Sequence, residues 1–240
     1  MRFDVLTLFP DMFEAVLGDS IIGRAREKGL VELNFINIRD FSKNKHKKVD
    51  AYPYSGGGGM VMAAQPIYDA YCHITEGLSY KPLTIYLSPQ GQVFSQGVVT
   101  KLSKEEHIIL LCGHYEGVDQ RVLDEIVDME ISIGDFVLTG GEIAAMAVVD
   151  AVSRMVPGVL SNEGSYENES HYNGLLEFPQ YTRPEEFLGR RVPEILISGH
   201  HAKIEEWKRQ QSLLVTRAKR PDLLEKAELS PEDIKFLNEN

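Results

Sequence analysis

Short apolar runs alternate with helical patterns along the first two thirds of the chain. Five runs rich in Val, Ile, Leu and Phe, bounded by Gly, Pro or Ser, predict β-strands at residues 3–9, 31–38, 83–87, 107–112 and 126–133. Helical patterns lie between them at residues 11–28, 66–74, 95–102 and 142–156. The last of these is apolar nearly all round, so we expect it to be buried against the sheet or another subunit. A repeated strand and helix order predicts an α/β fold with a mostly parallel sheet covered by helices on both faces.

The pattern changes after residue 158. Residues 161–170 are polar, acidic and without periodicity, which is typical of a linker. Further along, residues 201–219 follow a helical period and end before Pro221. Their packing stripe is expected to consist of Ile204, Trp207, Gln211, Leu214 and Ala218.

A second helix is expected close to the end of the chain. Ser230 is suited to cap a helix. Pro231 is suited to the first turn of that helix, and Asp233 is the acid expected at its third position. We therefore expect an α/β domain over residues 1–160, a flexible acidic linker over 161–180 and a small helical domain over 181–240.

Composition narrows the class of protein. The 240 residues are 43% hydrophobic and 25% charged, which provides for a buried core and excludes a disordered chain. The first apolar stretch is interrupted by Asp4 and Pro10, and no run approaches the ~18 apolar residues of a membrane span. Cys72 and Cys112 both lie in apolar runs, so we expect buried, reduced thiols in a cytoplasmic protein without a membrane partner.

The charge distribution is uneven. Lys and Arg number 25 against 36 Asp and Glu, a net charge of −11 that opposes binding to nucleic acid. Residues 181–220, however, contain nine basic and five acidic side chains, and residues 43–48 contain four lysines. A solvated loop is the simpler explanation of the lysine cluster taken alone, so charge by itself leaves a nucleic-acid partner open.

Three predicted strands are followed by polar, glycine-rich turns, at residues 87–91, 112–117 and 131–141. Ligands of open α/β sheets bind beyond the carboxyl ends of the strands, and glycine allows backbone N–H groups to approach a ligand closely. Each turn alone would be an ordinary connection, but three of them at consecutive strand ends predict one pocket.

Several familiar kinds of site are disfavoured. The turns lack the GxGxxG pattern of dinucleotide sites, and residues 55–60 lack the Lys-Ser/Thr of a P-loop, so this glycine run is equally a mobile or closely packed loop. His200 and His201 are adjacent, which prevents an i, i+4 metal pair, and the cysteines lack CxxC spacing. No GxSxG elbow is present either, so we expect neither a metal ion nor a serine nucleophile.

Longer motifs resemble a single family. The chain contains, in order, LFPDMF, KHKKVDAYPYSGGGGM, SPQGQ, CGHYEGVDQR, SIGDFVLTGGE, RMVPGVL, GLLEFPQYTRP and SGHHAKIEEW. These motifs resemble the bacterial tRNA (guanine-37-N1)-methyltransferases of the SPOUT superfamily over essentially the whole chain. The resemblance implies a deep trefoil knot in the α/β domain, S-adenosyl-L-methionine as methyl donor, tRNA with a guanosine at position 37 as substrate, and a homodimer.

The resemblance also assigns the methyl donor to the three turns. The implied cofactor-binding residues are Tyr86, Leu87, Ser88, Pro89, Gln90, Gly113, Tyr115, Glu116, Gly117, Ile133, Gly134, Asp135, Phe136, Val137, Leu138, Gly140 and Gly141. Backbone groups would hold the adenine, and Glu116 would offset positive charge on the methionyl group. Tyr115 and Ser132 are equally explained as packing residues.

The reaction requires a base and a cation. N1 of guanine carries a proton and is a poor nucleophile until a general base removes it, and the negative charge then spreads to O6. The resemblance assigns the base to Glu169 and the cation to Arg154, although the family usually has aspartate where this chain has Glu169. The structural alternative for Glu169 is a solvated linker acid, and that for Arg154 is an internal salt bridge. If Glu169 is not the base, Glu167 or Glu177 is the alternative.

Phosphate contacts are expected on both sides of the linker. The predicted tRNA-binding residues are Lys43, Lys45, His46, Lys47, Lys48, Arg183, Lys203 and Arg209. Arg217, Lys219 and Arg220 also suit a helix C-terminus by charge alone. Two other classes stay open: a non-catalytic RNA-binding protein, and a related methyltransferase that acts on a ribose 2′-oxygen or on pseudouridine.

Overall fold

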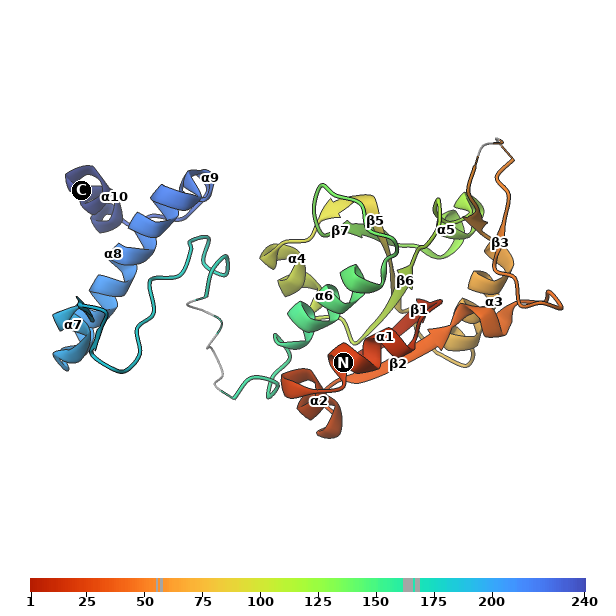
Figure 1. The fold of residues 1–240 in the computed structure, drawn as a ribbon, viewed down its shortest axis with the longest axis horizontal. Coiled ribbons are helices and arrows are strands. Elements are labelled where there is room, and N and C mark those ends of the chain that lie inside the picture. Colours follow the sequence, from red (N-terminus) through yellow and green to blue (C-terminus); the bar gives the residue numbers. More distant parts are fainter. Residues whose placement is uncertain (55, 57, 162–165, 167–168) are drawn as a thin grey trace. The chain divides into compact units, whose positions relative to one another are not determined.

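The computed structural model describes residues 1–54, 56, 58–161, 166 and 169–240. The chain divides into two compact units, Met1–Glu163 and Gly164–Asn240. Figure 1 labels the elements of both units along the chain. Within the described part, no helix combines the length and apolar character needed to cross a membrane.

A five-stranded sheet forms the centre of the first unit. Its strands, in spatial order, are β2 (Glu32–Asn37), β1 (Arg2–Thr7), β6 (His107–Cys112), β5 (Leu83–Val93) and β7 (Met129–Ser132). Every neighbouring pair is parallel, which confirms the parallel sheet predicted from the alternating pattern. A separate antiparallel pair, β3 (Asp50–Ala51) and β4 (Val61–Met62), lies outside this sheet.

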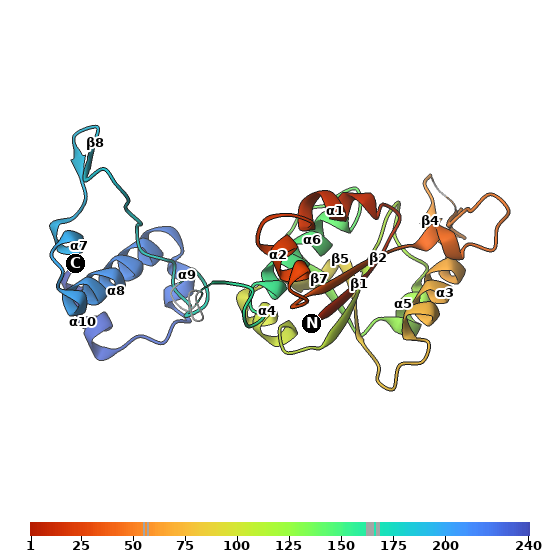
Figure 2. The same ribbon diagram turned by 90° about the horizontal axis from the view of Figure 1, so that it is seen from below.

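Helices cover both faces of the sheet, as predicted. One apolar core lies beneath α1 (Asp11–Leu17), α2 (Ser20–Glu27), α4 (Gln96–Leu102) and α6 (Glu142–Ser153). A second core lies beneath η1 (Ile38–Phe41), α3 (Ala64–Thr75) and α5 (Gln120–Ile126). The central strand β6 supplies both, because Ile108 and Leu110 face the first core while Ile109 and Leu111 face the second. Figure 2 shows α1 and α6 together on one side of the sheet.

The single helix predicted over residues 11–28 is wrong, because the chain breaks it in two. Gly18 ends α1 by donating its N–H to the carbonyl of Glu14 at 3.0 Å. Asp19 then adopts an extended conformation and its side chain accepts a hydrogen bond from the N–H of Ser20, at 2.6 Å. Aspartate side chains that cap the backbone in this way favour a helix start over a helix interior.

The predicted end of the third strand at residue 87 is also wrong. Strand β5 continues to Val93, but Leu87 and Gln92 both pair with Ile131, so residues 88–91 bulge out of the ladder. A side chain at Gly91 would overlap the backbone of β7, which explains why glycine ends the bulge. The strand predicted at 126–133 is shorter, since its first residue ends α5, a helix that the apolar pattern did not reveal.

The two cysteines differ in environment. Cys112 is fully buried on β6, and burial raises the pKa of its thiol well above the usual value, with the carboxylate of Glu142 adding to the rise. Cys72 is exposed, contrary to the expectation of two buried thiols. The reason is its position on α3, where Ile67 and Ala70 occupy the face toward the core.

The second unit contains α7 (Glu194–Ile197), α8 (His201–Lys219), α9 (Pro221–Leu224), α10 (Pro231–Glu239) and a short hairpin of β8 (Glu186–Phe187) and β9 (Arg190–Arg191). The helix predicted at 201–219 is confirmed with the same bounds. The predicted helix start at Ser230 is confirmed as well. Ser230 and Asp233 form a capping box in which each side chain accepts the other residue's backbone N–H.

Helix α8 packs through a face that differs from the predicted stripe. Its fully buried residues are Leu213 and Thr216. Thr216 Oγ1 accepts a hydrogen bond from the N–H of Leu176 at 2.9 Å, and Leu175 is 1% exposed. The predicted stripe is offset from this face by about one residue, so it leaves out Leu213, and it includes Ala218, which is exposed. This hydrogen bond holds Leu176 against α8.

Arg209 ties α8 to α10. Its guanidinium donates to both carboxylate oxygens of Asp233, at 3.1 and 2.7 Å, and the Asp233 side chain is 8% exposed. The hydrogen bond from Arg209 lowers the pKa of Asp233, and the backbone N–H of Ser230 contributes in the same direction. One carboxylate therefore caps α10 and anchors the helix to α8.

We predict that Arg209→Ala lowers the stability of α10 by about 1–3 kcal/mol at neutral pH, because it leaves a buried carboxylate without its charged partner. Since the folded-state pKa of Asp233 lies below the unfolded value, this stabilisation is present above the unfolded pKa and is lost as the pH falls through the folded one. Hydrogen exchange of the α10 amides across an acid series measures both effects. Lys235→Ala, which removes an exposed cation from the same helix, should change the stability by less than about 0.5 kcal/mol.

Candidate functional site

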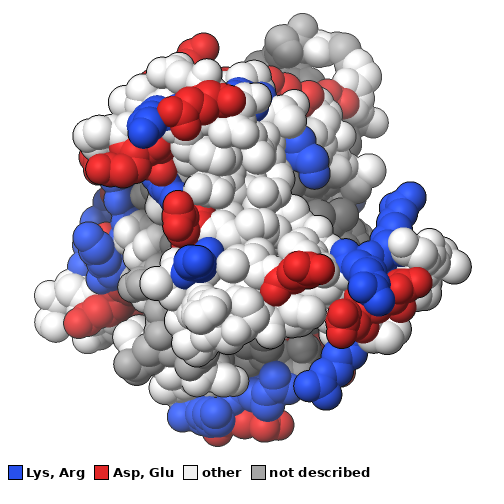
Figure 3. All heavy atoms as spheres, turned by 90° about the vertical axis from the view of Figure 1, so that its left-hand side faces the viewer, with Lys and Arg blue, Asp and Glu red and all other residues white. Residues whose placement is uncertain are grey.

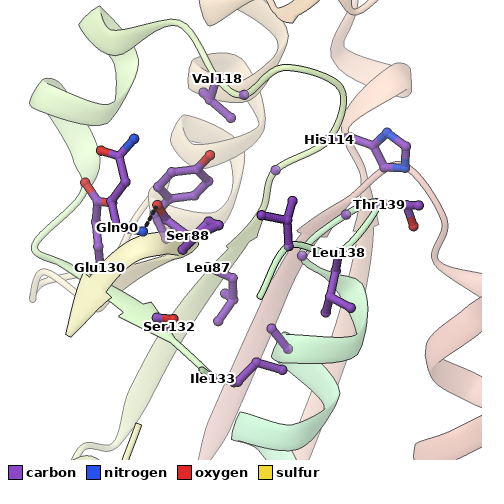
Figure 4. A pocket seen from close by; sticks show the side chains of 18 of the residues that line it. Leu87, Ser88, Gln90, His114, Val118, Glu130, Ser132, Ile133, Leu138 and Thr139 are labelled. Atoms are coloured by element: carbon purple, nitrogen blue, oxygen red, sulfur yellow. Dashed lines mark hydrogen bonds between the residues drawn. The ribbon is translucent and has the colours of Figure 1, made fainter. Parts of the chain in front are cut away.

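The three glycine-rich turns meet at one cavity of about 390 Å³ in the first unit. Two of them follow β6 and β7, and the third is the bulge within β5. Figure 4 shows Gln90 and Glu130 on one side of this pocket and Leu138 and Thr139 on the other. The single pocket predicted from the turns is therefore present at the carboxyl edge of the parallel sheet.

The lining contains every residue that the sequence assigns to the methyl donor except Asp135, which is exposed beside Gly134. The lining also contains residues that the assignment left out: His114, Val118, Gln120, Leu123, Glu130, Ser132, Thr139 and Ala144. His114, Ser132 and Thr139 belong to the same turns, so their place in the motifs was a usable signal. Glu130 was harder to find, because its position follows from pairing opposite Tyr86 in the neighbouring strand.

Glycine at two positions allows the turns to touch through their backbones. The N–H of Gly141, just before α6, donates to the carbonyl of Gly113 at 2.9 Å. A Cβ added to Gly141 would lie 2.9 Å from the Cα of Cys112, closer than real contacts allow. A Cβ on Gly113 would lie 2.8 Å from the hydroxyl of Tyr86. Larger residues would therefore push the walls of the pocket apart.

The turn after β6 is held from outside the sheet. Tyr115 adopts a left-handed conformation with φ of 59°, and Gly117 has φ of 126°. The N–H of Glu116 donates to the carbonyl of Met60 at 2.9 Å, and the N–H of Met62 donates to the carbonyl of Gly117, also at 2.9 Å. The turn is thus fixed between the sheet and the β3–β4 hairpin, and Tyr115 remains 43% exposed at the pocket.

The polar groups of the pocket favour a cation and hydrogen-bond donors. Burial raises the pKa of the Tyr86 phenol, and the nearby Glu130 carboxylate raises it further, so the hydroxyl stays protonated. Glu116 and Glu130 add two carboxylates to the lining. Ser132 Oγ donates to the carbonyl of Gly134 at 3.0 Å and accepts its N–H at 3.2 Å, so this side chain organises the turn.

His114 forms part of the wall. Its ring lies between Phe9, at 5.3 Å between ring centroids, and Tyr115, at 5.0 Å. Among the residues that the structure describes, the buried Nδ1 of His114 has no hydrogen-bond partner. A buried polar atom without a partner in the protein indicates a position at which a ligand or a water molecule makes the missing bond.

The two predicted catalytic residues belong to different units. Arg154 is half-buried at the C-terminal end of α6, where its N–H donates to the carbonyl of Asp150 at 3.1 Å. Glu169 is half-buried in the second unit, and its N–H donates to the carbonyl of Tyr166 at 3.1 Å. Of the alternative bases, Glu177 is half-buried and accepts a hydrogen bond from Gln180 at 2.6 Å, whereas Glu167 lies outside the described residues.

The lysine cluster of the first unit lies on the surface. Its predicted RNA contacts, all exposed, are Lys43, Lys45, His46, Lys47 and Lys48. Lys43 forms an ion pair with Asp69 at 2.8 Å, and Lys47 donates to the carbonyl of Asp40 at 3.0 Å. The Asn44 side chain accepts the N–H of His46 at 2.8 Å, which gives the segment a defined turn.

The predicted basic residues of the second unit are not equivalent. Arg183 and Lys203 are exposed, but Arg209 is engaged by Asp233. On the face drawn in Figure 3, Lys and Arg side chains are interspersed with Asp and Glu rather than gathered in one patch. Phosphate contacts here would rest on separate cations rather than on a continuous basic surface.

Comparison with known proteins gives a consistent family. The sequence matches the family described as tRNA (Guanine-1)-methyltransferase TrmD over residues 1–226. The tRNA (guanine-N(1)-)-methyltransferase of Ruminiclostridium cellulolyticum is 64% identical over 226 residues, which cover 94% of this chain and 97% of the relative. Proteins of the same name from Caldanaerobacter subterraneus subsp. tengcongensis and Clostridium perfringens are 59% and 56% identical and cover 98–100% of both chains. The resemblance seen in the motifs is confirmed, and the chain belongs to the tRNA (Guanine-1)-methyltransferase TrmD family.

Proposed function

We propose that this chain transfers the methyl group of S-adenosyl-L-methionine to N1 of the guanosine at position 37 of tRNA, next to the anticodon. The observation that carries this proposal is the meeting of three glycine-rich turns at one pocket in a member of this family. Incubation with labelled S-adenosyl-L-methionine and unmodified tRNA, followed by nucleoside analysis, should give 1-methylguanosine at position 37. A methyl group on ribose or pseudouridine, or RNA binding without transfer, would contradict it.

The pocket suits S-adenosyl-L-methionine in size and chemistry. Its volume of about 390 Å³ lies in the range of sites for ligands of this size. The carboxylates of Glu116 and Glu130 would face the positive charges of the methionyl part. Gly117 has open space where a Cβ would stand, and His114 Nδ1 has no partner in the described part of the chain, so both the backbone and a side chain can accommodate a ligand. When bound, the donor supplies an electrophilic methyl group.

The acceptor also needs a base and a cation, and the described lining of the donor pocket contains no Lys or Arg. The Glu169 carboxylate would remove the proton from N1 of guanine, and the Arg154 guanidinium would stabilise the charge that develops on O6. Because Glu169 belongs to the second unit and the pocket to the first, the reaction would depend on both. We accordingly assign donor binding to residues 1–160, the base to the linker over 161–180 and tRNA contacts to residues 181–240.

A homodimer is supported by an apolar surface on the first unit. Most of α6 is buried against the sheet, but Ile143 remains 54% exposed. On α1, Met12 and Val16 are 42% and 57% exposed. Helices α1 and α6 contact each other (Figure 2), so the exposed apolar side chains belong to two neighbouring helices. A second copy of the chain covering this face would remove the apolar side chains from water.

We also propose the trefoil knot of the superfamily for this fold. Support comes from the close backbone contact between Gly113 and Gly141, which joins the turn after β6 to the segment that leads into α6. The turn after β6 also contacts Met60 and Met62, so segments from three parts of the sequence meet there. A knot of this kind is an exception to the ordinary topology of protein chains.

The RNA contacts proposed for this function are the exposed cations of both units. Lys43, Lys45, His46, Lys47 and Lys48 would contact phosphates on the first unit, and Arg183 and Lys203 would do so on the second unit. Lys43 is 74% exposed despite its ion pair with Asp69. Arg209 is a weaker candidate, because Asp233 already occupies its guanidinium. We place the enzyme in the cytoplasm, where its tRNA substrate is processed.

We predict that Glu169→Gln lowers the rate of methyl transfer by about 10²–10⁴-fold, because the amide keeps the size of the side chain and loses its basicity. Single-turnover assays measure the chemical step without interference from product release.

Two controls accompany this experiment. Glu169→Asp restores the residue usual in the family and should keep substantial activity, and calorimetry should give the Gln variant a normal affinity for S-adenosyl-L-methionine. If Glu169→Gln transferred methyl groups at nearly the wild-type rate and Glu177→Gln lost activity, the role of general base would be assigned to Glu177.

A mixture of two inactive variants tests whether the active site is composite. If Arg154 and Glu169 act from opposite subunits, a dimer of one Arg154→Ala chain and one Glu169→Ala chain contains one intact site. Equal mixing should therefore restore about a quarter of wild-type activity after subunit exchange, since half of the dimers are mixed. Light scattering at micromolar concentration must show a dimer, and a monomer would contradict the prediction.

A further inference from the structure

A second cavity lies beside the donor pocket. The groove has a volume of about 1170 Å³ and is lined by the β3–β4 hairpin, α3 and the start of α5. Three tyrosines line it, Tyr52, Tyr54 and Tyr68. Val118 and Gln120 line both the groove and the donor pocket, so the two are adjacent.

The tyrosines of this groove are unusually open to solvent. Tyr52 is 81% exposed, Tyr54 is fully exposed and Tyr68 is 42% exposed. Aromatic rings ordinarily gain stability by burial, so rings held open at the wall of a groove indicate a surface that a partner covers. Every nucleobase has a flat face that can stack on such a ring, and this stacking tolerates any base sequence.

The cations that could attract a polyanion lie beside the groove, because Arg121 is the one basic residue in its described lining. The lysine cluster of residues 43–48 leads directly into β3, and its position is fixed by buried Val49, whose carbonyl accepts the N–H of Ala63 at 2.8 Å. The acids are largely compensated. Asp69 pairs with Lys43 at 2.8 Å and Asp119 pairs with Arg121 at 2.6 Å, which leaves Glu125 as the remaining acid of the lining.

The hairpin connects this surface to the donor pocket. Met60 and Met62 hydrogen-bond to the turn that carries Glu116, and the N–H of Asp119 donates to the carbonyl of Met62 at 3.0 Å. A strand of nucleotides along the groove would therefore arrive at the pocket wall formed by Val118 and Gln120.

We propose that this groove is a stacking site for single-stranded RNA, and that Tyr52 and Tyr54 stack on the unpaired nucleotides that flank the target guanosine. The inference rests on the proposed function for the identity of the RNA. The basic segment would bind the phosphates, while the rings would bind the bases. Affinity would then depend on unpaired nucleotides and not on their sequence.

Paired substitutions test the rings directly. A Tyr52→Ala/Tyr54→Ala variant should bind a fluorescent anticodon stem-loop at least about 30-fold more weakly, since two stacking contacts are lost, whereas Tyr52→Phe/Tyr54→Phe, which keeps both rings, should bind within about twofold of the wild type. Both variants should bind S-adenosyl-L-methionine normally in calorimetry. A fully paired RNA of the same length should bind all three proteins equally.

Three outcomes would overturn the proposal. The first is unchanged RNA affinity in the Ala variant. The second is an equal loss in the Ala and Phe variants, which would point to the hydroxyls rather than to stacking. The third is failure of 4-thiouridine placed next to position 37 to cross-link to the peptide that carries Tyr52 and Tyr54. Loss of the proposed function is seen separately, because wild-type protein would then bind the stem-loop without methylating it.

Discussion

The pocket depends on the backbone contact between Gly113 and Gly141. Gly113 directly follows β6 and Gly141 directly precedes α6, and the hydrogen bond of 2.9 Å between them leaves no space for a side chain. The contact brings the turn after β6 against the turn that follows β7, while Tyr86 on β5 closes in on Gly113. Three polar turns that would otherwise lie side by side along a sheet edge are thereby drawn around one cavity.

Much of the first unit follows from local pattern. Strand β6 has the bounds that its apolar run predicts, because a fully buried central strand has few competing interactions, and helix α8 of the second unit also has its predicted bounds. The failures occur where a polar group determines the backbone. Asp19 starts a new helix within an apparently continuous one, and Asp119 caps α5 by accepting the N–H of Arg121 at 3.0 Å. Hydrophobic period carries no information about such caps.

The pocket was predictable in its turns but not in its walls. The motifs identified the residues whose backbones approach the cavity, since glycine in those positions is a local signal. Glu130 lines the pocket because strand pairing places it opposite Tyr86. Val118 lines the pocket because it forms a β-bridge with Met62. The role of Arg209 was likewise hidden, because its partner Asp233 lies 24 residues away and is fixed by a helix cap. Long-range pairings of this kind depend on the assembled fold, so the local sequence around each residue does not predict them.

An acidic chain can still bind RNA if its cations occur in the right places. The net charge of −11 is an average over the chain, whereas phosphate contacts depend on the few angstroms around each cation. In the first unit, the exposed lysines, the open tyrosines and the turn carrying Glu116 are all joined through the β3–β4 hairpin. The contact with the donor pocket consists of the hydrogen bonds of Met60 and Met62 to the turn that carries Glu116. If RNA binds along this hairpin as proposed, its phosphates meet the local cations rather than the average charge of the chain, and the same segment contacts one wall of the donor pocket.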